Sequence, residues 1–281
     1  MSKVVLVTDS TSGMPAELAR QYNVIVAAQT LIWGKETFLD SVTIQPDEFY
    51  QRLETATVMP SSSQLSPAEF EKVFRELLDQ GYDVLAVLVS TKLSGTINSA
   101  VQAKAAIQSD RIEIVDSLTT SMALGFGVME AARLASQGAS LAECKKAAEE
   151  ACQRTGVVIS VETLEFLHRG GRIGGASRLI GTALNIKPIL ELQNGRIEPL
   201  EKVRTRAKAL ARMVDLLGER TDGKPFQVAV VHANAEEEAR ALLNQVTSRF
   251  QTTLQVIAPV SPVVGTHVGP GTLGLVWMIG G

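Results

Sequence analysis

The sequence predicts an α/β protein in which a mostly parallel sheet is followed by a second, α+β part with a mixed sheet. Two observations carry this prediction. Short apolar runs alternate with helical patterns as far as about residue 155, and a strong hairpin signal, Asn194-Gly195, appears after that point. A chain of 281 residues is long enough for two domains. We therefore expect an α/β domain over residues 1–155 and an α+β domain over residues 156–281.

The strands of the first half are predicted from short apolar runs rich in β-branched residues. These runs are Val4–Val7, Val24–Leu31, Val84–Ser90 and Ile112–Val115. Helices are expected between them, where proline stands in a first turn or where serine is followed three residues later by glutamate, as in a capping box. The helix starts lie near Pro15, Pro46, Ser66 and Ser140. Residues 33–44 are expected to form a hairpin or loop, and Ser61–Ser63 a loop.

The second half contains more apolar runs and fewer alternating units. Predicted strands are Val157–Val161, Lys187–Gln193, Arg196–Val203, Phe226–His232, Leu254–Pro259 and Leu273–Ile279. Predicted helices are Ser177–Leu184, Arg204–Glu219 and Ala235–Phe250. Two glycine-containing segments, His168–Gly175 and Val263–Thr272, are expected to be loops.

Polar residues follow three of the predicted parallel strands, at Asp9–Ser12, Ser90–Ser94 and Asp116-Ser117. In open α/β sheets the ligand crevice lies beyond the carboxyl ends of the strands, so these ends are expected to converge. Ser94 is expected to cap the helix that runs to Ile107. Because a helix start carries unpaired N–H groups and partial positive charge, the sequence indicates an anion site here.

Several function classes are disfavoured by composition and motifs. The net charge of −3 provides no basic field for nucleic acid. No phosphate-binding GxxxxGK[ST] motif occurs, and the GxGxxG match at Gly269–Gly274 is followed by too few residues for a dinucleotide-binding unit. No apolar run is long enough to span a membrane, and the apolar start is too short for a signal peptide. We therefore expect a cytoplasmic protein with at most transient membrane contact.

Metal and disulfide chemistry are also not expected. Cys144 and Cys152 lie on one predicted helix, about 12 Å apart along its axis, which is too far for a disulfide. The three histidines, His168, His232 and His267, belong to no zinc-binding pattern. We expect no metal and no cofactor.

The residues leave alternatives open. Ser94, Asp9 and His267 could form a nucleophilic triad, although Ser94 lies outside a GxSxG motif, so a serine acyl hydrolase is an alternative. A binding module for another small anion is a further alternative. Arg169 and Arg172 place cationic groups in a glycine-rich segment, which is suited to docking an acidic partner or a phosphate.

Taken together, the motifs resemble those of the DegV family, fatty-acid-binding proteins that include the FakB subunits of bacterial fatty acid kinase. The matching segments are VTDSTS (Val7–Ser12), SSSQLSP (Ser61–Pro67), LSGTINSA (Leu93–Ala100), VDS (Val115–Ser117), ETLEFLHRGGRIG (Glu162–Gly174), IKPIL (Ile186–Leu190) and HVGPGTLG (His267–Gly274). They follow one another in order through nearly the whole chain, as one unit spanning about residues 3–280.

The resemblance implies two domains with a long-chain fatty acid, such as palmitate, in a tunnel between them. It implies that Ser62, Ser63 and Ser94 bind the carboxylate, with Gly95 beside Ser94 and His267 in the same polar network. Ser62 stands where the family usually has threonine, which keeps the hydroxyl and loses a methyl. The family's opening motif usually ends in Asp, whereas this chain has Gly13.

The resemblance also implies that the protein is not an enzyme and has no catalytic residues. It would present the fatty acid to a separate ATP-binding kinase subunit and then carry the acyl phosphate. Hydroxyls and helix N–H groups are expected to bind the carboxylate without help from an arginine. Arg169 and Arg172 are accordingly expected to meet the kinase partner.

Overall fold

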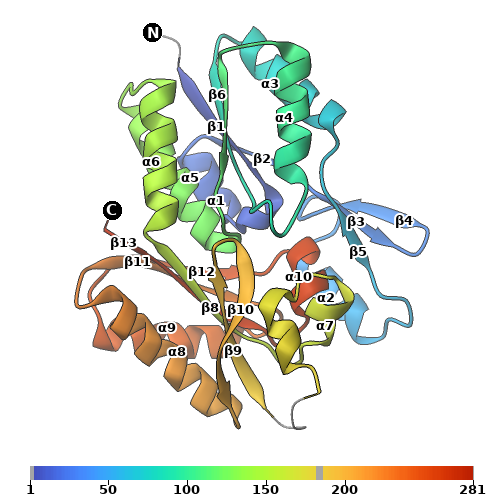
Figure 1. Ribbon diagram of the computed structural model, residues 1–281, viewed down its shortest axis with the longest axis vertical. Coiled ribbons are helices and arrows are strands. Elements are labelled where there is room, and N and C mark those ends of the chain that lie inside the picture. Colours follow the sequence, from blue (N-terminus) through green and yellow to red (C-terminus); the bar gives the residue numbers. More distant parts are fainter. Residues whose placement is uncertain (1–2, 182–185, 281) are drawn as a thin grey trace.

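The computed structural model describes residues 3–181 and 186–280 of the chain (Figure 1). A four-stranded parallel sheet with the order β2-β1-β6-β7 forms the first part, which confirms the predicted parallel sheet. Its strands are β1 (Val4–Asp9), β2 (Val24–Ala27), β6 (Asp83–Leu88) and β7 (Ile112–Asp116).

Helices cover both faces of this sheet, because the central strands β1 and β6 carry apolar side chains on both faces. Side chains alternate along β1, so Val4 and Leu6 pack towards one pair of helices, while Val5 and Val7 pack towards the other. The first pair is α5 (Ser121–Ser136) with α6 (Leu141–Gln153), and the second is α3 (Pro67–Asp79) with α4 (Thr96–Ile107); Figure 1 shows the pairs on opposite sides of the strands. Cys144 and Cys152 both lie on α6 and are free thiols.

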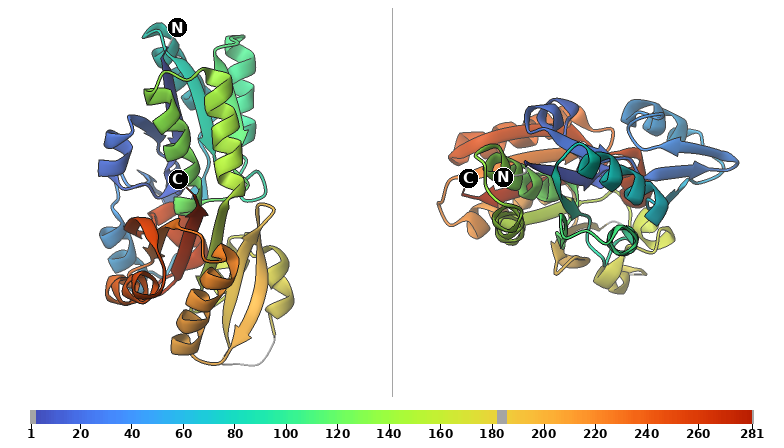
Figure 2. Two further views of the ribbon diagram at one scale, coloured as in Figure 1. Left: turned by 90° about the vertical axis from the view of Figure 1, so that its left-hand side faces the viewer. Right: turned by 90° about the horizontal axis from the view of Figure 1, so that it is seen from above.

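The second sheet has the order β10-β9-β8-β13-β11-β12. Its strands are β8 (Thr155–Ser160), β9 (Lys187–Gln193), β10 (Arg196–Val203), β11 (Phe226–His232), β12 (Thr252–Pro259) and β13 (Leu273–Ile279). The β11–β12 pair is parallel and the other pairs are antiparallel, so the predicted mixed sheet is confirmed. Helices α8 (Arg206–Thr221) and α9 (Glu236–Arg249) cover one face, at the end of the molecule opposite the N-terminus (Figure 2).

Helix α5 joins the two parts. Residues Met122 to Met129 are buried around the whole helix, as expected for one that contacts apolar surfaces on every side. Leu124 and Val128 pack against the parallel sheet, whereas Met122 and Phe126 belong to a cluster that also contains residues of the mixed sheet. That cluster draws on both sides of residue 155, and the domain boundary there remains a prediction.

Three local expectations for the first half of the chain were wrong. The run Val24–Leu31 is divided between β2 and β3 (Thr30–Trp33), because the chain leaves the parallel sheet after Ala27. Strand β3 instead forms a separate antiparallel sheet with β4 (Glu36–Leu39) and β5 (Ser61–Ser63), so Ser61–Ser63 is a strand rather than a loop. Helix α4 begins after Gly95, one residue later than expected.

The two glycine-containing segments are partly helical. His168 and Arg169 lie in α7 (Glu165–Arg169), and His267 lies in α10 (Pro262–Val268), which starts from Ser261 as N-cap and Pro262. The remaining helices are α1 (Ala16–Gln21) and α2 (Pro46–Glu54), with short 3₁₀ turns η1 (Ser10–Ser12) and η2 (Gly174–Leu179). The helix expected over Ser177–Leu184 is not found in its described part: residues 177–179 form the end of η2, Ile180 and Gly181 lie in a turn, and residues 182–184 lie outside the described residues.

Within residues 3–181 and 186–280, every helix is too short or too polar to cross a membrane.

Candidate functional site

A cavity of about 180 Å³ lies where the loop before α4, strand β5, helix α10 and the segment after α7 meet. Its polar lining comprises Thr11, Gln29, Ser62, Ser63, Gln64, Ser94, Thr120, Arg172 and His267. Its apolar lining comprises Val89, Leu93, Leu167, Ile197, Val264 and Val268. Polar groups beside an aliphatic wall suit an amphipathic ligand with one polar end.

Strand β5 places Ser62 and Ser63 differently, because side chains alternate along a strand. Ser62 pairs with fully buried Leu31 in the register of the sheet and is itself half-buried. Its Oγ lies 2.7 Å from His267 Nε2. Ser63 is exposed, and its Oγ donates to the Gln64 carbonyl at 3.4 Å. Both serines border the cavity, but Ser62 has the more direct position in the polar network.

The loop before α4 brings Ser94 to the cavity, with Gly95 next to it in the chain. The Ser94 Oγ lies 2.8 Å from Thr96 Oγ1 and accepts from the Thr96 N–H at 3.3 Å. The Gly95 N–H donates to Gln64 Oε1 at 3.2 Å, so it is already paired. A Cβ at Gly95 would lie 2.5 Å from Gln64 Nε2, which explains the glycine by close packing of this amide. The Ser94 hydroxyl is therefore the group of this loop that can reach a ligand.

His267 stands in the last turn of α10, where its ring is held from two sides. Its Nε2 bonds Ser62, while its Nδ1 is buried without a hydrogen-bond partner among the described residues. A Cβ at Gly170 would lie 2.1 Å from that Nδ1, so Gly170 permits the close approach of α7 and α10. Burial, followed by the charge of Arg172, lowers the pKa of His267 to about 4. The ring is neutral at pH 7.

The two arginines expected to meet a partner have different positions. Arg169 is exposed and paired with Glu165 on its own helix, outside the cavity. Arg172 lines the cavity, where its Nε donates to the Leu93 carbonyl at 3.0 Å and another N–H to the Gly170 carbonyl at 2.6 Å. Arg172 thus brings positive charge to the cavity wall, where carboxylate binding was expected to need no arginine.

Two buried carboxylates bind segments that contribute to the cavity wall. Asp9 accepts hydrogen bonds from Thr11, Gln29 and Val89. Asp40 accepts from Ser10 at 2.6 Å and from the Val263 N–H at 3.0 Å, in the first turn of α10. Burial raises the pKa of both carboxyls, against the lowering effect of these hydrogen bonds.

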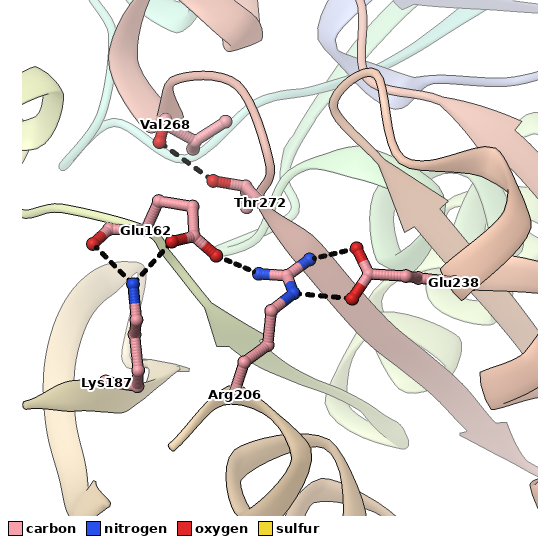
Figure 3. A network of polar contacts seen from close by, with 6 residues as sticks. All are labelled: Glu162, Lys187, Arg206, Glu238, Val268 and Thr272. Atoms are coloured by element: carbon pink, nitrogen blue, oxygen red, sulfur yellow. Dashed lines mark hydrogen bonds and ion pairs between the residues drawn. The ribbon is translucent and has the colours of Figure 1, made fainter. Parts of the chain in front are cut away.

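A polar network anchors the segment that leads from β8 into α7 (Figure 3). Glu162 bonds Lys187 at the start of β9 and Arg206 at the start of α8, and Arg206 also pairs with Glu238 of α9. Burial opposes ionisation, but Lys187 and Arg206 together lower the pKa of Glu162. A Cβ at Gly271 would lie 2.6 Å from Glu162 Cγ, so the loop after α10 packs on the same carboxylate side chain. The network thus ties the segment after β8 to β9, α8 and α9, and the loop after α10 packs against it.

Sequence reasoning brought together Ser62, Ser63, Ser94, Gly95 and His267, and all except Gly95 border the cavity. Gln29, Gln64 and Thr120 were not among the expected site residues, whereas Thr11 belongs to the polar strand end Asp9–Ser12 that was expected at the crevice. Gln64 could have been found, because it directly follows Ser63 in the SSSQLSP segment. Gln29 carried no motif signal, since its place depends on the turn between β2 and β3. The imagined triad is not formed: Asp9, Ser94 and His267 each bond other residues.

No cluster of three or more histidine, cysteine, aspartate or glutamate side chains arranged to hold a metal ion occurs among the described residues.

Similarity to known proteins decides the family. Residues 3–279 match the DegV family, whose own description is that of an uncharacterised protein. The chain belongs to the DegV family. A DegV domain-containing protein of Streptomyces coelicolor is 36% identical over 275 residues, with 97% of each chain covered. Protein DegV of Bacillus subtilis is 33% identical over 277 residues, with 98% of each chain covered.

Solved DegV structures share the fold. A DegV family protein from Thermus thermophilus, described by its fatty acid binding, superposes with a TM-score of 0.93 at 33% identity and covers 99% of both chains. DegV from Bacillus subtilis, described as a fatty acid binding protein, gives a TM-score of 0.89 at 32% identity over the full length of both chains. These structural relatives of the chain are thus fatty acid binding proteins.

Proposed function

We propose that this protein binds one long-chain fatty acid, with its carboxylate at Ser62, Ser94 and Arg172 and its tail along the apolar wall of the cavity and between the two sheets. The observation that carries the proposal is the single cavity in which these three side chains meet an aliphatic lining. The fatty acid binding of the relatives from Thermus thermophilus and Bacillus subtilis supports it.

The tail supplies most of the affinity. Burying about 15 methylenes at about 0.8 kcal/mol each yields a gross gain of about 12 kcal/mol. Ordering the chain and losing its freedom of motion removes a large part of this gain. Each hydrogen bond to the charged carboxylate adds about 1.5–3 kcal/mol. The head-group residues therefore set the orientation of the ligand and its selectivity more than its total affinity.

The head group would be held from three directions. Ser94 comes from the loop before α4, Ser62 from β5 and Arg172 from the segment after α7. Ser63 is an outer neighbour, because its side chain is exposed. Arg172 already uses N–H groups on two carbonyls, so its contribution to the carboxylate is mainly its positive charge.

We also propose that the bound carboxylate is presented to an ATP-binding kinase subunit, after which the protein carries the acyl phosphate. Ser62, Arg172 and His267 border both the cavity and a second hollow of about 300 Å³ that includes Arg169. A partner docked over this hollow would reach the carboxylate across one layer of side chains. Arg169 remains the candidate for contact with that partner. Use of ATP by the partner implies a cytoplasmic site of action.

Calorimetric titration with palmitate tests the binding proposal. We expect saturation at one palmitate per chain, and lack of binding would overturn the proposal. Acyl phosphate should form from bound palmitate and ATP only after a purified ATP-binding subunit of a bacterial fatty acid kinase is added. Formation without that subunit would contradict the presenting role.

The hydrolase alternative has one observation in its favour, the Ser62–His267 pair at 2.7 Å. A general base needs a pKa near the working pH and an orienting partner, whereas His267 has a pKa of about 4 and an Nδ1 without a partner among the described residues. Ser94, the candidate nucleophile in the sequence, bonds Thr96 instead of a histidine. Release of p-nitrophenol from p-nitrophenyl palmitate by the purified protein, lost in Ser62→Ala, would favour the hydrolase.

A further inference from the structure

A chain of hydrogen bonds runs from buried Asp9 to Ser94 at the cavity. Asp9 Oδ1 lies 3.0 Å from Gln29 Nε2, which lies 3.2 Å from Thr96 Oγ1. Thr96 Oγ1 in turn lies 2.8 Å from Ser94 Oγ. Asp9 and Thr96 are fully buried, Gln29 is 3% exposed, and Ser94 borders the cavity. We refer to these four residues as the Asp9–Ser94 chain.

The first link has a defined direction. Oδ1 of Asp9 accepts from the Thr11 N–H, the Thr11 hydroxyl and Gln29, and Oδ2 accepts from the Val89 N–H. Every one of these partners is a donor, as a carboxylate requires. The Gln29 amide must therefore turn its NH₂ group towards Asp9, because its oxygen would be repelled there. The same NH₂ group carries the second hydrogen that Thr96 Oγ1 accepts.

The direction of the Gln29–Thr96 hydrogen bond also determines the donor in the Thr96–Ser94 hydrogen bond. A hydroxyl has one hydrogen to donate, and Thr96 Oγ1 accepts from Gln29, so its own hydrogen is available for Ser94. The distance of 2.8 Å allows either hydroxyl to donate, but Gln29 Nε2 and Ser94 Oγ are the only partners of Thr96 Oγ1 among the described residues, and Gln29 is a donor. The Thr96 hydrogen is therefore donated to Ser94 Oγ, which also accepts from the Thr96 N–H at 3.3 Å. With both lone pairs engaged, the remaining function of the Ser94 hydroxyl is to donate, and the cavity is where it can do so. Successive bonds of the same direction also strengthen the final donor.

We infer that Asp9, Gln29 and Thr96 are positioning residues that fix Ser94 as a hydrogen-bond donor towards the cavity, so that the site selects an ionised carboxylate over a head group with a hydroxyl to donate. The inference rests on the proposed function. The charged and titratable groups around the head group are Arg172 and His267 at the cavity wall, and buried Asp9 and Asp40, which bind segments of that wall. The oxygen of a long-chain alcohol can also accept from Ser94, but a neutral oxygen accepts a weaker hydrogen bond than a carboxylate does. Because both acceptor positions of Ser94 are occupied, Ser94 cannot accept the hydrogen of the alcohol.

The test compares Thr96→Val, which removes the linking hydroxyl at nearly constant shape, with Thr96→Ser, which keeps it. Thr119→Val is the matched control, because the buried Thr119 Oγ1 has no partner among the described residues. Calorimetry gives the affinities of palmitate and hexadecanol. Thr96→Val should lower the ratio of these affinities about tenfold, the effect of about one hydrogen bond to a charged group, and Thr96→Ser and Thr119→Val should leave it within about twofold.

A spectroscopic measurement separates positioning from a general loss of stability. The carboxyl carbon of bound palmitate, labelled with carbon-13, reports the pH at which the carboxylate is protonated. Thr96→Val should raise that pH relative to wild type and Thr96→Ser, because a lost donor favours the neutral acid. This inference alone would be overturned if the wild-type protein binds palmitate and Thr96→Val changes neither the ratio of palmitate to hexadecanol affinity nor the pH at which bound palmitate is protonated. A wild-type protein that binds no palmitate would overturn the proposed function and this inference with it.

Discussion

The two sides of the head-group site differ in how firmly their hydroxyls are oriented. Ser94 ends a chain of hydrogen bonds that begins at a fully buried carboxylate, so its direction of donation is set by the core. Ser62 bonds His267, whose other ring nitrogen has no partner among residues 3–181 and 186–280. Asp40 supports the start of α10, but His267 stands at the end of that helix. The Ser94 side is thus polarised, while the Ser62–His267 pair can exchange donor and acceptor roles.

The largest expected effect concerns His267 and acid stability. Its pKa of about 4 lies below the usual 6.5, so between about pH 4 and pH 6.5 this histidine is protonated in the unfolded chain and neutral in the folded chain. The free energy of unfolding therefore falls as the pH is lowered from 6.5 to about 4, by at most about 3 kcal/mol. Urea unfolding at pH 7 and pH 4.5 should show that the free energy of unfolding falls less for His267→Gln than for wild type. Contributions from other titratable groups cancel when the two proteins are compared. An equal fall in the free energy of unfolding for the two proteins would contradict the lowered pKa of His267.

The second largest effect is expected for Ser94→Ala. This substitution should reduce palmitate affinity by about tenfold to a hundredfold, as expected for the loss of one hydrogen bond to a charged group. Ser62→Ala should cost less, because His267 Nε2 stays in place for the carboxylate. Exposed Ser63 provides the matched serine control, and Ser63→Ala should change the affinity by less than about twofold. Titration calorimetry on the folded variants gives the ranking. A larger loss in Ser62→Ala than in Ser94→Ala would reverse the comparison of the two sides.

Gly170→Ala should lower palmitate affinity about fivefold, which is within the usual range for a single substitution. The backbone φ of −71° accepts alanine without strain, so the effect comes from the new methyl meeting the His267 ring. A double-mutant cycle with His267→Ala isolates this contact. In the His267→Ala background the second substitution should have no further effect. An undiminished effect there would show that Gly170 acts elsewhere.

The smallest effect is expected at Arg169. Its ion pair with Glu165 is exposed on both sides and contributes little to stability. Arg169→Ala should leave palmitate affinity within about twofold of wild type, whereas Arg172→Ala should weaken binding by removing the positive charge at the cavity. Acyl phosphate formation with the added kinase subunit should fall in Arg169→Ala. Unchanged formation would remove Arg169 from the partner surface.

Much of the fold was predictable, because apolar runs, capping boxes and the Asn194-Gly195 turn are local signals. The parallel sheet, the mixed sheet and most helices follow from them. The division of Val24–Leu31 was not predictable, since both halves are apolar and only the separate β3–β4–β5 sheet distinguishes them. Helix α10 was missed, although Ser261-Pro262 is a local start signal, because the following glycines suggested a loop.

In the candidate site, too, residues in local motifs were predictable, and residues placed by long-range contacts were not. Ser62, Ser94 and His267 were proposed from motifs, and the cavity contains them. Arg172 was expected, with Arg169, to meet the kinase partner, and this remains a prediction; its hydrogen bonds to the carbonyls of Leu93 and Gly170 could not be read from a glycine-rich segment. The role of Gln29 depends on three segments far apart in the chain, at Asp9, Gln29 and Thr96, and no local pattern reports such a contact.

Native mass spectrometry of the purified protein after incubation with palmitate tests the central claim most directly. Binding of one fatty acid in a cavity with a carboxylate site predicts a single added mass of palmitate on the wild-type chain, strongly reduced in a Ser62→Ala, Ser94→Ala double variant that remains folded. A wild-type chain without any bound fatty acid after loading would contradict the claim.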